Sequence, residues 1–137
     1  MGEITNESPN GELTIRTLAM PKDTNPHGDI FGGWVLSQMD IAGGIYTRKQ
    51  TGQKTVTVAV DAMEFLLPVL VGDVICCYCR TVKVGKTSMT VDVDVYVSRQ
   101  FEHERIKVTE GRFTYVAIDA TRRPIKIRRI ADQEGES

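Results

Sequence analysis

One segment constrains the fold more than any other: residues 30 to about 48, IFGGWVLSQMDIAGGIYTR, are expected to form a helix that is apolar on nearly every side. The length of the segment and its lack of period-2 alternation favour a helix over a strand. A surface helix would keep one polar face, whereas the large side chains here, such as Trp34, Met39 and Ile45, point in different directions. We therefore expect other structure to surround this helix.

Two local features accompany the expected helix. Asp29 closes the turn-like sequence TNPHGD and stands where a helix N-cap is expected. Gly43 and Gly44 lie in the helix interior, where each costs about 1 kcal/mol relative to Ala. This cost predicts that backbone from another element comes very close to the two glycines.

Most of the remaining chain has the pattern of strands. They are predicted at residues 13–20, 55–65, 74–84, 87–97 and 106–118, with a polar hairpin at 99–104. The short connections between the last four strands favour antiparallel pairing, and one helix with such a sheet makes an α+β fold. A single five-stranded sheet cannot cover every side of an apolar helix. We therefore expect the sheet to curl around the helix and a second copy to complete the cover, which makes at least a homodimer.

Length and charge limit the class of protein. A chain of 137 residues suits one domain with its own core, which we place at 12–120 between a flexible N-terminal tail, 1–11, and a charged C-terminal tail, 121–137. The net charge of −1 argues against nucleic acid or a polybasic membrane anchor as partner. No apolar stretch reaches the roughly 20 residues of a membrane span, and the first residues lack a signal-peptide pattern. We expect a cytoplasmic protein.

Three cysteines, Cys76, Cys77 and Cys79, lie within one predicted strand. Alternation along a strand would divide their thiols between two faces, and no second cluster completes a tetrahedral zinc site. We interpret them as buried strand residues rather than metal ligands.

Three features of the helix region could support chemistry. Asp40 places a carboxylate in an apolar helix, which is typical either of a functional acid or of a structural acid paired with a nearby hydroxyl or backbone group. Gly32 and Gly33 at the helix start could let a carbonyl oxygen or an oxyanion approach the free backbone amides, or could serve only close packing. Asn25, in the preceding loop, could orient a water or a carbonyl, although Asn is also common in turns.

Basic residues form the last feature. They lie around one turn and near the C-terminus, as Arg80, Lys83, Lys86, Arg122, Arg123, Lys126, Arg128 and Arg129. Such groups can hold phosphates, although any single one is more often solvated surface. His27 and His103 are interpreted as surface loop residues.

Several sequence runs occur together in the order of a known family. RTLAMPKDTNPHGDIFGGWVLSQMDIAGG is followed by TVAVDAMEFLLPVLVGDVICCY, VGKTSM and VTEGRFTYVAID. Over residues 13–119 the chain resembles the hotdog-fold acyl-CoA thioesterases, and closely the short bacterial YciA-type branch.

The resemblance implies a curved antiparallel sheet around one long central helix, a double-hotdog dimer and a hexamer built as a trimer of dimers. It also implies hydrolysis of acyl-CoA thioesters without a metal or bound cofactor. Asn25, Gly32 and Asp40 match the family's catalytic positions, with the acid contributed by the partner chain. The Gly32 amide would stabilise the oxyanion, and Asp40 would act as general base or as nucleophile. Relatives more often carry small or polar residues at Pro26 and His27.

Coenzyme A is strongly anionic, so we expect basic residues to meet its phosphates. The candidate CoA-binding residues are Gly33, Gly85, Lys86, Thr87, Arg122 and Arg123. Two other functions use the same fold: a non-catalytic acyl-CoA-binding sensor, and a dehydratase that would need a catalytic histidine, for which His27 is the candidate.

Overall fold

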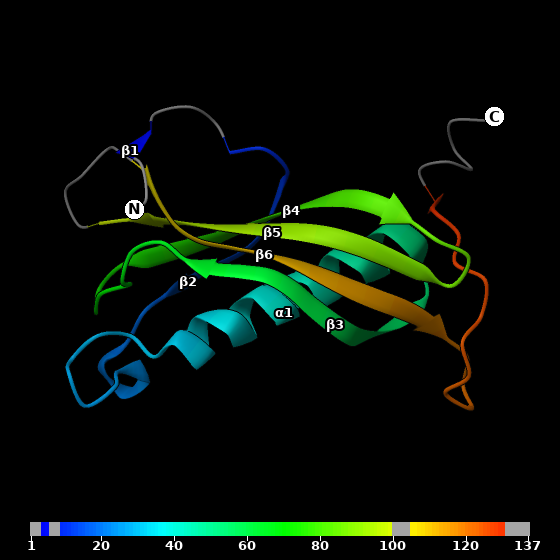
Figure 1. The fold of residues 1–137 in the computed structure, drawn as a ribbon, viewed down its shortest axis with the longest axis horizontal. Helices are drawn as coiled ribbons and strands as arrows, with labels where there is room; N and C mark the ends of the chain where they lie inside the picture. Colours follow the sequence, from blue (N-terminus) through cyan, green and yellow to red (C-terminus); the bar gives the residue numbers. More distant parts are fainter. Residues whose placement is uncertain (1–3, 6–8, 100–104, 131–137) are drawn as a thin grey trace.

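A single long helix, α1 (Gly32–Thr51), lies along one face of a curved antiparallel sheet (Figure 1). The computed structural model describes residues 4–5, 9–99 and 105–130. The strands are β1 (Ile4–Thr5), β2 (Glu12–Leu18), β3 (Lys54–Phe65), β4 (Val74–Val84), β5 (Ser88–Ser98) and β6 (Arg105–Ile118), and a short 3-10 helix, η1 (Pro21–Asp23), follows β2. The α+β architecture predicted from the sequence is confirmed, and each predicted strand agrees with an observed one to within two residues at either end.

The strands are ordered β3-β6-β5-β4-β2, and β1 adds a short piece beside β6. Every pairing is antiparallel. In the part of the chain that the structure describes, β3 pairs with β6 alone, so its other edge is free of strand partners. The predicted hairpin at 99–104 and His103 lie outside the described residues, apart from Arg99.

The core lies between one face of α1 and the inner face of the sheet. Val35, Met39, Ala42 and Tyr46 recur at helical spacing and are buried against alternate residues of β5: Met89, Val91, Val93, Val95 and Val97. The other side of the helix is uncovered, with Ile41 51% and Ile45 46% exposed. The expectation that one sheet leaves part of this helix uncovered is confirmed.

The helix begins later than the sequence predicts. Its N-cap is Phe31, whose backbone is extended and whose side chain makes no capping hydrogen bond. Asp29 is therefore not the N-cap, and the prediction was wrong. The backbone N–H of Ile30 donates to the carbonyl of Val69 at 3.0 Å, which holds the chain extended past Asp29. The helix ends at Gly52, whose φ of 66° ends it in the left-handed conformation.

The three cysteines are buried in β4, as predicted. Cys77 and Cys79 belong to the core beneath the helix, whereas Cys76 alternates to the opposite face. Burial raises the pKa of Cys77 to about 12 and that of Cys79 to about 11, so both remain protonated thiols at neutral pH.

Both predicted tails include residues that contact the sheet. Ile4 and Thr5 pair with Ile106 and Arg105, and Ile127 is buried. The domain boundaries placed at 12 and 120 stay predictions. No helix among the described residues is long and apolar enough to cross a membrane.

Candidate active site

The loop before α1 fixes the side chain of Asn25. Its Oδ1 accepts hydrogen bonds from the backbone N–H groups of His27 at 2.9 Å and Asp29 at 3.2 Å. The amide oxygen is thus used inside the loop. Within residues 9–99 and 105–130 the Nδ2 group has no hydrogen-bond partner, so its two donors remain available to a ligand.

The N-terminus of α1 presents unused backbone donors beside this loop. The N–H groups of Gly32 and Gly33 precede the first intrahelical hydrogen bonds, and no side chain caps the helix. A Cβ added at Gly32 would touch only the ring of Phe65, at 3.6 Å, so packing within the chain does not require glycine there. The lack of a side chain instead leaves the amide open to an approaching group.

Asn25 and Gly32 share one pocket of about 290 Å³. Its remaining wall is largely apolar and comes from the loop before α1, α1 itself, the end of β3, the loop after β3, and β6. Those wall residues are Asp29, Ile30, Val35, Phe65, Leu66, Leu67, Pro68, Val69 and Thr109. The pocket therefore combines two sets of N–H donors with a surface that suits an alkyl chain.

Asp40 lies in a different place. It follows Gly32 by eight residues of α1, which corresponds to about 12 Å of helix rise. Its Oδ1 accepts hydrogen bonds from Thr57 Oγ1 at 2.6 Å and from the Tyr115 hydroxyl at 3.0 Å. Oδ2 has no hydrogen-bond partner in the described part of the chain. Both readings of the sequence are thus compatible with the contacts: hydroxyls satisfy one oxygen, and the other is free to react.

A second pocket, of about 340 Å³, opens beside Asp40 between α1, β3 and β6. It shares no residue with the pocket around Asn25. Within one chain, the predicted catalytic residues therefore fall into two groups, with Asn25 and Gly32 together and Asp40 apart from both.

Tyr115 explains one of the interior glycines. A Cβ added at Gly43 would collide with the Tyr115 hydroxyl, whereas at Gly44 the nearest ring atom would be 4.0 Å away. The sequence predicts a close approach of backbone at both positions. The structure corrects this, because the close neighbour is a side chain and only Gly43 is needed. Gly43 lets the tyrosine reach Asp40, where burial and the Asp40 carboxylate raise the tyrosine's pKa, so the hydroxyl stays a donor.

Sequence reasoning did not identify Thr57 or Tyr115. The two residues are paired in the register of β3 and β6, which places both hydroxyls beside Asp40. Threonine and tyrosine are common in strands, so composition alone gives no signal for this pair. Only the register reveals it.

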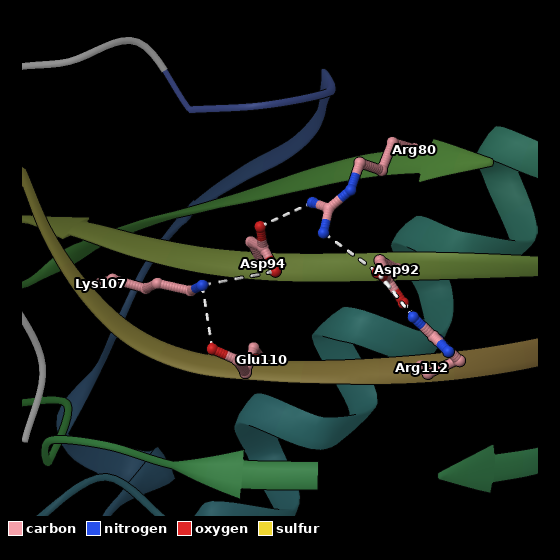
Figure 2. A network of polar contacts seen from close by, with 6 residues as sticks. All are labelled: Arg80, Asp92, Asp94, Lys107, Glu110 and Arg112. Carbon is pink, nitrogen blue, oxygen red and sulfur yellow. Dashed lines mark hydrogen bonds and ion pairs between the residues drawn. The ribbon is translucent and has the colours of Figure 1, made fainter. Parts of the chain in front are cut away.

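The sequence predicts that Arg80 belongs to a basic cluster at the β4–β5 turn. The structure corrects this prediction. Figure 2 shows its guanidinium on the sheet face, where it donates to Asp94 at 2.9 Å and to Asp92 at 3.0 Å. Burial by itself would lower the pKa of Arg80, but the hydrogen bond to Asp94 and the nearby carboxylates raise it. The same network continues through Arg112, Lys107 and Glu110. Arg80 is thus neutralised by its own sheet.

Two other segments that carry basic residues, the β4–β5 turn and the C-terminal segment, contact each other. The Ile127 N–H donates to the carbonyl of Lys86 at 2.9 Å, which joins the β4–β5 turn to the C-terminal segment. Arg122 and Arg123 lie in an exposed turn held by Asp119, whose Oδ1 accepts the N–H of Arg123 at 3.0 Å. The hydrogen bonds that the Asp119 carboxylate accepts from Arg123 and Thr121 lower its pKa. We call the exposed residues Lys83, Lys86, Arg122, Arg123, Lys126 and Arg128 the basic end.

The basic end lies near the C-terminus of α1, whereas the loop with Asn25 lies at the other end of the helix (Figure 1). Gly85 and Thr87 belong to the turn itself, where the Gly85 N–H donates to Ser88 O at 2.8 Å. The side chain of His27 is exposed, and the residue does not line the pocket around Asn25.

Comparisons with known proteins agree on one family. A family model described as the thioesterase superfamily matches residues 27–100. The acyl-CoA thioester hydrolase YciA of Salmonella typhimurium is 51% identical over 120 residues, which cover 85% of this chain and 90% of that protein. The corresponding protein of Escherichia coli K12 is 49% identical over 88% of this chain and 93% of its own.

Solved structures match as well. The hexameric thioesterase y2039 from Yersinia pestis superposes with a TM-score of 0.84 at 51% identity, covering 89% of this chain and 99% of that one. HI0827, a hexameric broad-specificity acyl-coenzyme A thioesterase, gives a TM-score of 0.84 at 46% identity over 95% of this chain and 90% of its own.

Proposed function

The chain belongs to the thioesterase superfamily, and from this membership we propose that it hydrolyses acyl-CoA thioesters to a free carboxylic acid and coenzyme A. The observation that carries the proposal is the pocket lined by both Gly32, whose backbone N–H is unused at the start of α1, and Asn25, whose Nδ2 has no partner among the described residues. A thioester needs donors at its carbonyl oxygen and a place for its alkyl chain, and this pocket offers both.

The donors act on the carbonyl oxygen. The Gly32 N–H, reinforced by the dipole of a 20-residue helix, stabilises the negative charge that develops on this oxygen when the carbonyl carbon is attacked. Asn25 orients the thioester or the attacking water through Nδ2. Gly33 supplies a second free amide at the same helix end.

Asp40 supplies the attacking oxygen. As general base it takes a proton from water, and the resulting hydroxide adds to the carbonyl carbon; as nucleophile, its free oxygen adds directly and forms an anhydride that water then opens. In both routes the carbon–sulfur bond breaks and coenzyme A leaves as its thiolate. Thr57 and Tyr115 are positioning residues, because they hold Oδ1 and leave Oδ2 without a hydrogen-bond partner among the described residues.

In the proposed assembly, a second copy of the chain brings Asp40 beside the pocket that contains Asn25 and Gly32. Ile41 and Ile45 are exposed on the helix beside Asp40, and Val58 and Val60 are exposed on β3, whose outer edge is free of strand partners among the described residues. We place the partner on this face, so that each Asp40 completes the pocket around the partner's Asn25. The similar structures y2039 and HI0827 are hexamers, and we propose a trimer of such dimers here.

The basic end is proposed to bind the phosphates of coenzyme A through Lys86, Arg122 and Arg123, with the turn residues Gly85 and Thr87 beside them. Catalysis without a metal or bound cofactor and a cytoplasmic location stay predictions from the sequence. The dehydratase alternative loses support, because the exposed His27 lies outside the pocket.

The test is release of free coenzyme A from butyryl-CoA, followed with a thiol reagent. The unsubstituted protein is expected to release it steadily, whereas an acyl-CoA-binding sensor would bind the ester without turnover. Asp40→Asn should keep the fold and lower kcat at least about a hundredfold, because an amide neither accepts the proton nor forms the anhydride.

Asp23→Asn is a matched control, since Asp23 caps the exposed η1. It should leave kcat within about twofold. Near-normal turnover by Asp40→Asn would exclude Asp40 as base and as nucleophile.

A further inference from the structure

Among the residues that the structure describes, one buried hydroxyl is left without a partner. Thr109 of β6 is fully buried, and its Oγ1 makes no hydrogen bond within the described residues. The other fully buried threonines are satisfied: Thr47 and Thr55 share a hydrogen bond of 2.8 Å, and Thr51 donates to the Thr47 carbonyl at 2.7 Å. Since an unpaired buried hydroxyl costs free energy, Thr109 calls for an explanation from its surroundings.

Those surroundings are the pocket that contains Asn25 and Gly32. Thr109 pairs with Phe65 on one side and Val95 on the other, and Val95 belongs to the row of β5 residues beneath α1. The threonine therefore lies on the helix side of the sheet. Apart from Asn25 and Gly32, the pocket is lined by one carboxylate residue, Asp29, and by apolar residues: Ile30, Val35 and the segment from Phe65 to Val69.

The proposed reaction sets the orientation of an ester in this pocket. With its carbonyl oxygen at the N–H donors of Asn25 and Gly32, its alkyl carbons are expected to run along the apolar part of the lining, to which Thr109 belongs. The part of the pocket that one chain forms, about 290 Å³, is at the small end of the range for ligand sites, roughly 300–1,000 Å³, so a short acyl group is the first substrate to test. Thr109 lines the same pocket as Asn25 and Gly32, so we expect its hydroxyl to lie near acyl carbons close to the thioester.

We propose that Thr109 is a specificity-determining residue, whose Oγ1 hydrogen-bonds an oxygen substituent on the acyl chain near the thioester. The favoured substrates are then short acyl-CoA esters that carry a 3-hydroxyl group, in preference to plain alkyl esters of the same length. This inference rests on the proposed function. Its physical basis is that a buried polar group left unpaired by an alkyl chain discriminates against that chain, whereas an apolar wall barely separates the two.

The experiment compares kcat/KM for butyryl-CoA and for both enantiomers of 3-hydroxybutyryl-CoA. The unsubstituted protein is expected to prefer one hydroxy ester at least about tenfold. The ratio to compare is kcat/KM for the preferred hydroxy ester divided by kcat/KM for butyryl-CoA. Thr109→Val, which keeps the shape of the side chain and removes the hydroxyl, should bring this ratio close to one. Thr109→Ser, which keeps the hydroxyl, should retain most of the preference. Thr90→Val, on the opposite face of the sheet, is the matched control and should leave the ratio unchanged.

Equal ratios in the unsubstituted protein and in Thr109→Val would overturn the proposal, because the hydroxyl would then be satisfied by water or by the partner chain. Removing an unpaired buried hydroxyl should not lower the thermal unfolding temperature. Measuring this temperature for Thr109→Val shows whether the variant is folded before its kinetics are compared. If no ester is hydrolysed at all, the proposed function fails. In that case, titration calorimetry gives the Kd values of the same esters for the unsubstituted protein and for Thr109→Val. Tighter binding of the hydroxy ester that is lost in Thr109→Val supports the inference, and equal Kd ratios in the two proteins overturn it.

Discussion

Asp40 gains its place in the site from two hydroxyl groups on neighbouring strands. Thr57 and Tyr115 both donate to Oδ1, which fixes the carboxylate and leaves Oδ2 without a partner among the described residues. A carboxylate that is held through one oxygen and free at the other is suited to attack or to proton transfer. The same contacts would also satisfy a structural acid, so kinetics on variants of Asp40 decide between the two.

Single residues differ in how well the sequence reveals them. Asp40 could be singled out because a charge in an apolar helix is unusual, and Asn25 and Gly32 were added through their position at the helix start. The sequence could not single out Thr57, Tyr115 or Thr109, because their roles depend on strand register and on hydrogen-bond partners. Arg80 was assigned to the wrong surface, since its two acidic partners are distant in sequence.

The buried thiols predict a loss of stability at alkaline pH. Unfolded cysteines lose their protons near the ordinary pKa of 9.0, while Cys77 and Cys79 keep theirs to about 12 and 11. Their contribution is thus fully present below pH 9 and is lost as the pH rises toward about 11 for Cys79 and about 12 for Cys77. We expect each thiol to reduce the free energy of unfolding by about 1 kcal/mol at pH 10, measured by urea denaturation.

Cys77→Val removes one of these titrations and keeps an apolar side chain on the strand. Its free energy of unfolding should therefore decline less between pH 8 and pH 10 than that of the unsubstituted protein. Parallel declines in the two proteins would contradict the assignment of the effect to Cys77.

At the scale of elements, α1 was predictable in type and in length but not at its start. Its apolar composition identifies a helix that needs cover on several sides. The boundary at Gly32 depends on the hydrogen bond between Ile30 and Val69, which joins segments far apart in the sequence. The strands were predicted closely, because Gly and Pro turns separate long runs of β-branched residues.

The adjacent glycines Gly43 and Gly44 provide a matched pair within this helix. Gly43→Ala should lower the free energy of unfolding by about 1–3 kcal/mol, because its Cβ collides with the Tyr115 hydroxyl. It should also reduce kcat by displacing this hydroxyl from Asp40. Gly44→Ala meets no close neighbour in the chain and should change the free energy of unfolding by no more than about 1 kcal/mol. Equal losses in thermal unfolding would show that helix geometry, rather than the tyrosine, requires Gly43.

At the scale of the whole molecule, the proposed dimer assigns the two halves of the site to different protomers. The apolar helix already predicts a partner, but one sequence does not show which residues of two chains meet. The separation of Asp40 from the pocket around Asn25 is what the structure adds.

This separation predicts complementation between inactive variants. Asn25→Ala and Asp40→Asn should each be nearly inactive alone. When the two are mixed and refolded, about half of the dimers are mixed, and each mixed dimer should hold one intact site and one doubly defective site. Hydrolysis of butyryl-CoA should then recover to about a quarter of the unsubstituted activity. No recovery in a sample where mass spectrometry detects mixed dimers would place the whole site within one chain.

The basic end should act on substrate capture rather than on chemistry. Lys86→Gln and the double variant Arg122→Gln with Arg123→Gln are expected to raise KM for acyl-CoA several-fold and to weaken its salt dependence, with kcat nearly unchanged. Arg16→Gln, on exposed β2, removes the same charge elsewhere and should leave KM unaltered. Unchanged KM at low salt in all these variants would show that other residues hold the phosphates.

The outer edge of β3, which has no strand partner among the described residues, and the uncovered side of α1 have a consequence for the cell as well as for the fold. If the proposed dimer is required, a lone chain offers the donors of Asn25 and Gly32 to the ester but has no carboxylate beside them to attack it. At low abundance such chains would hold acyl-CoA without destroying it, and hydrolysis would begin only once enough copies have accumulated to pair. The amount of this protein then sets the activity of each molecule as well as the number of molecules, so a modest change in its synthesis would change the flux more than proportionally.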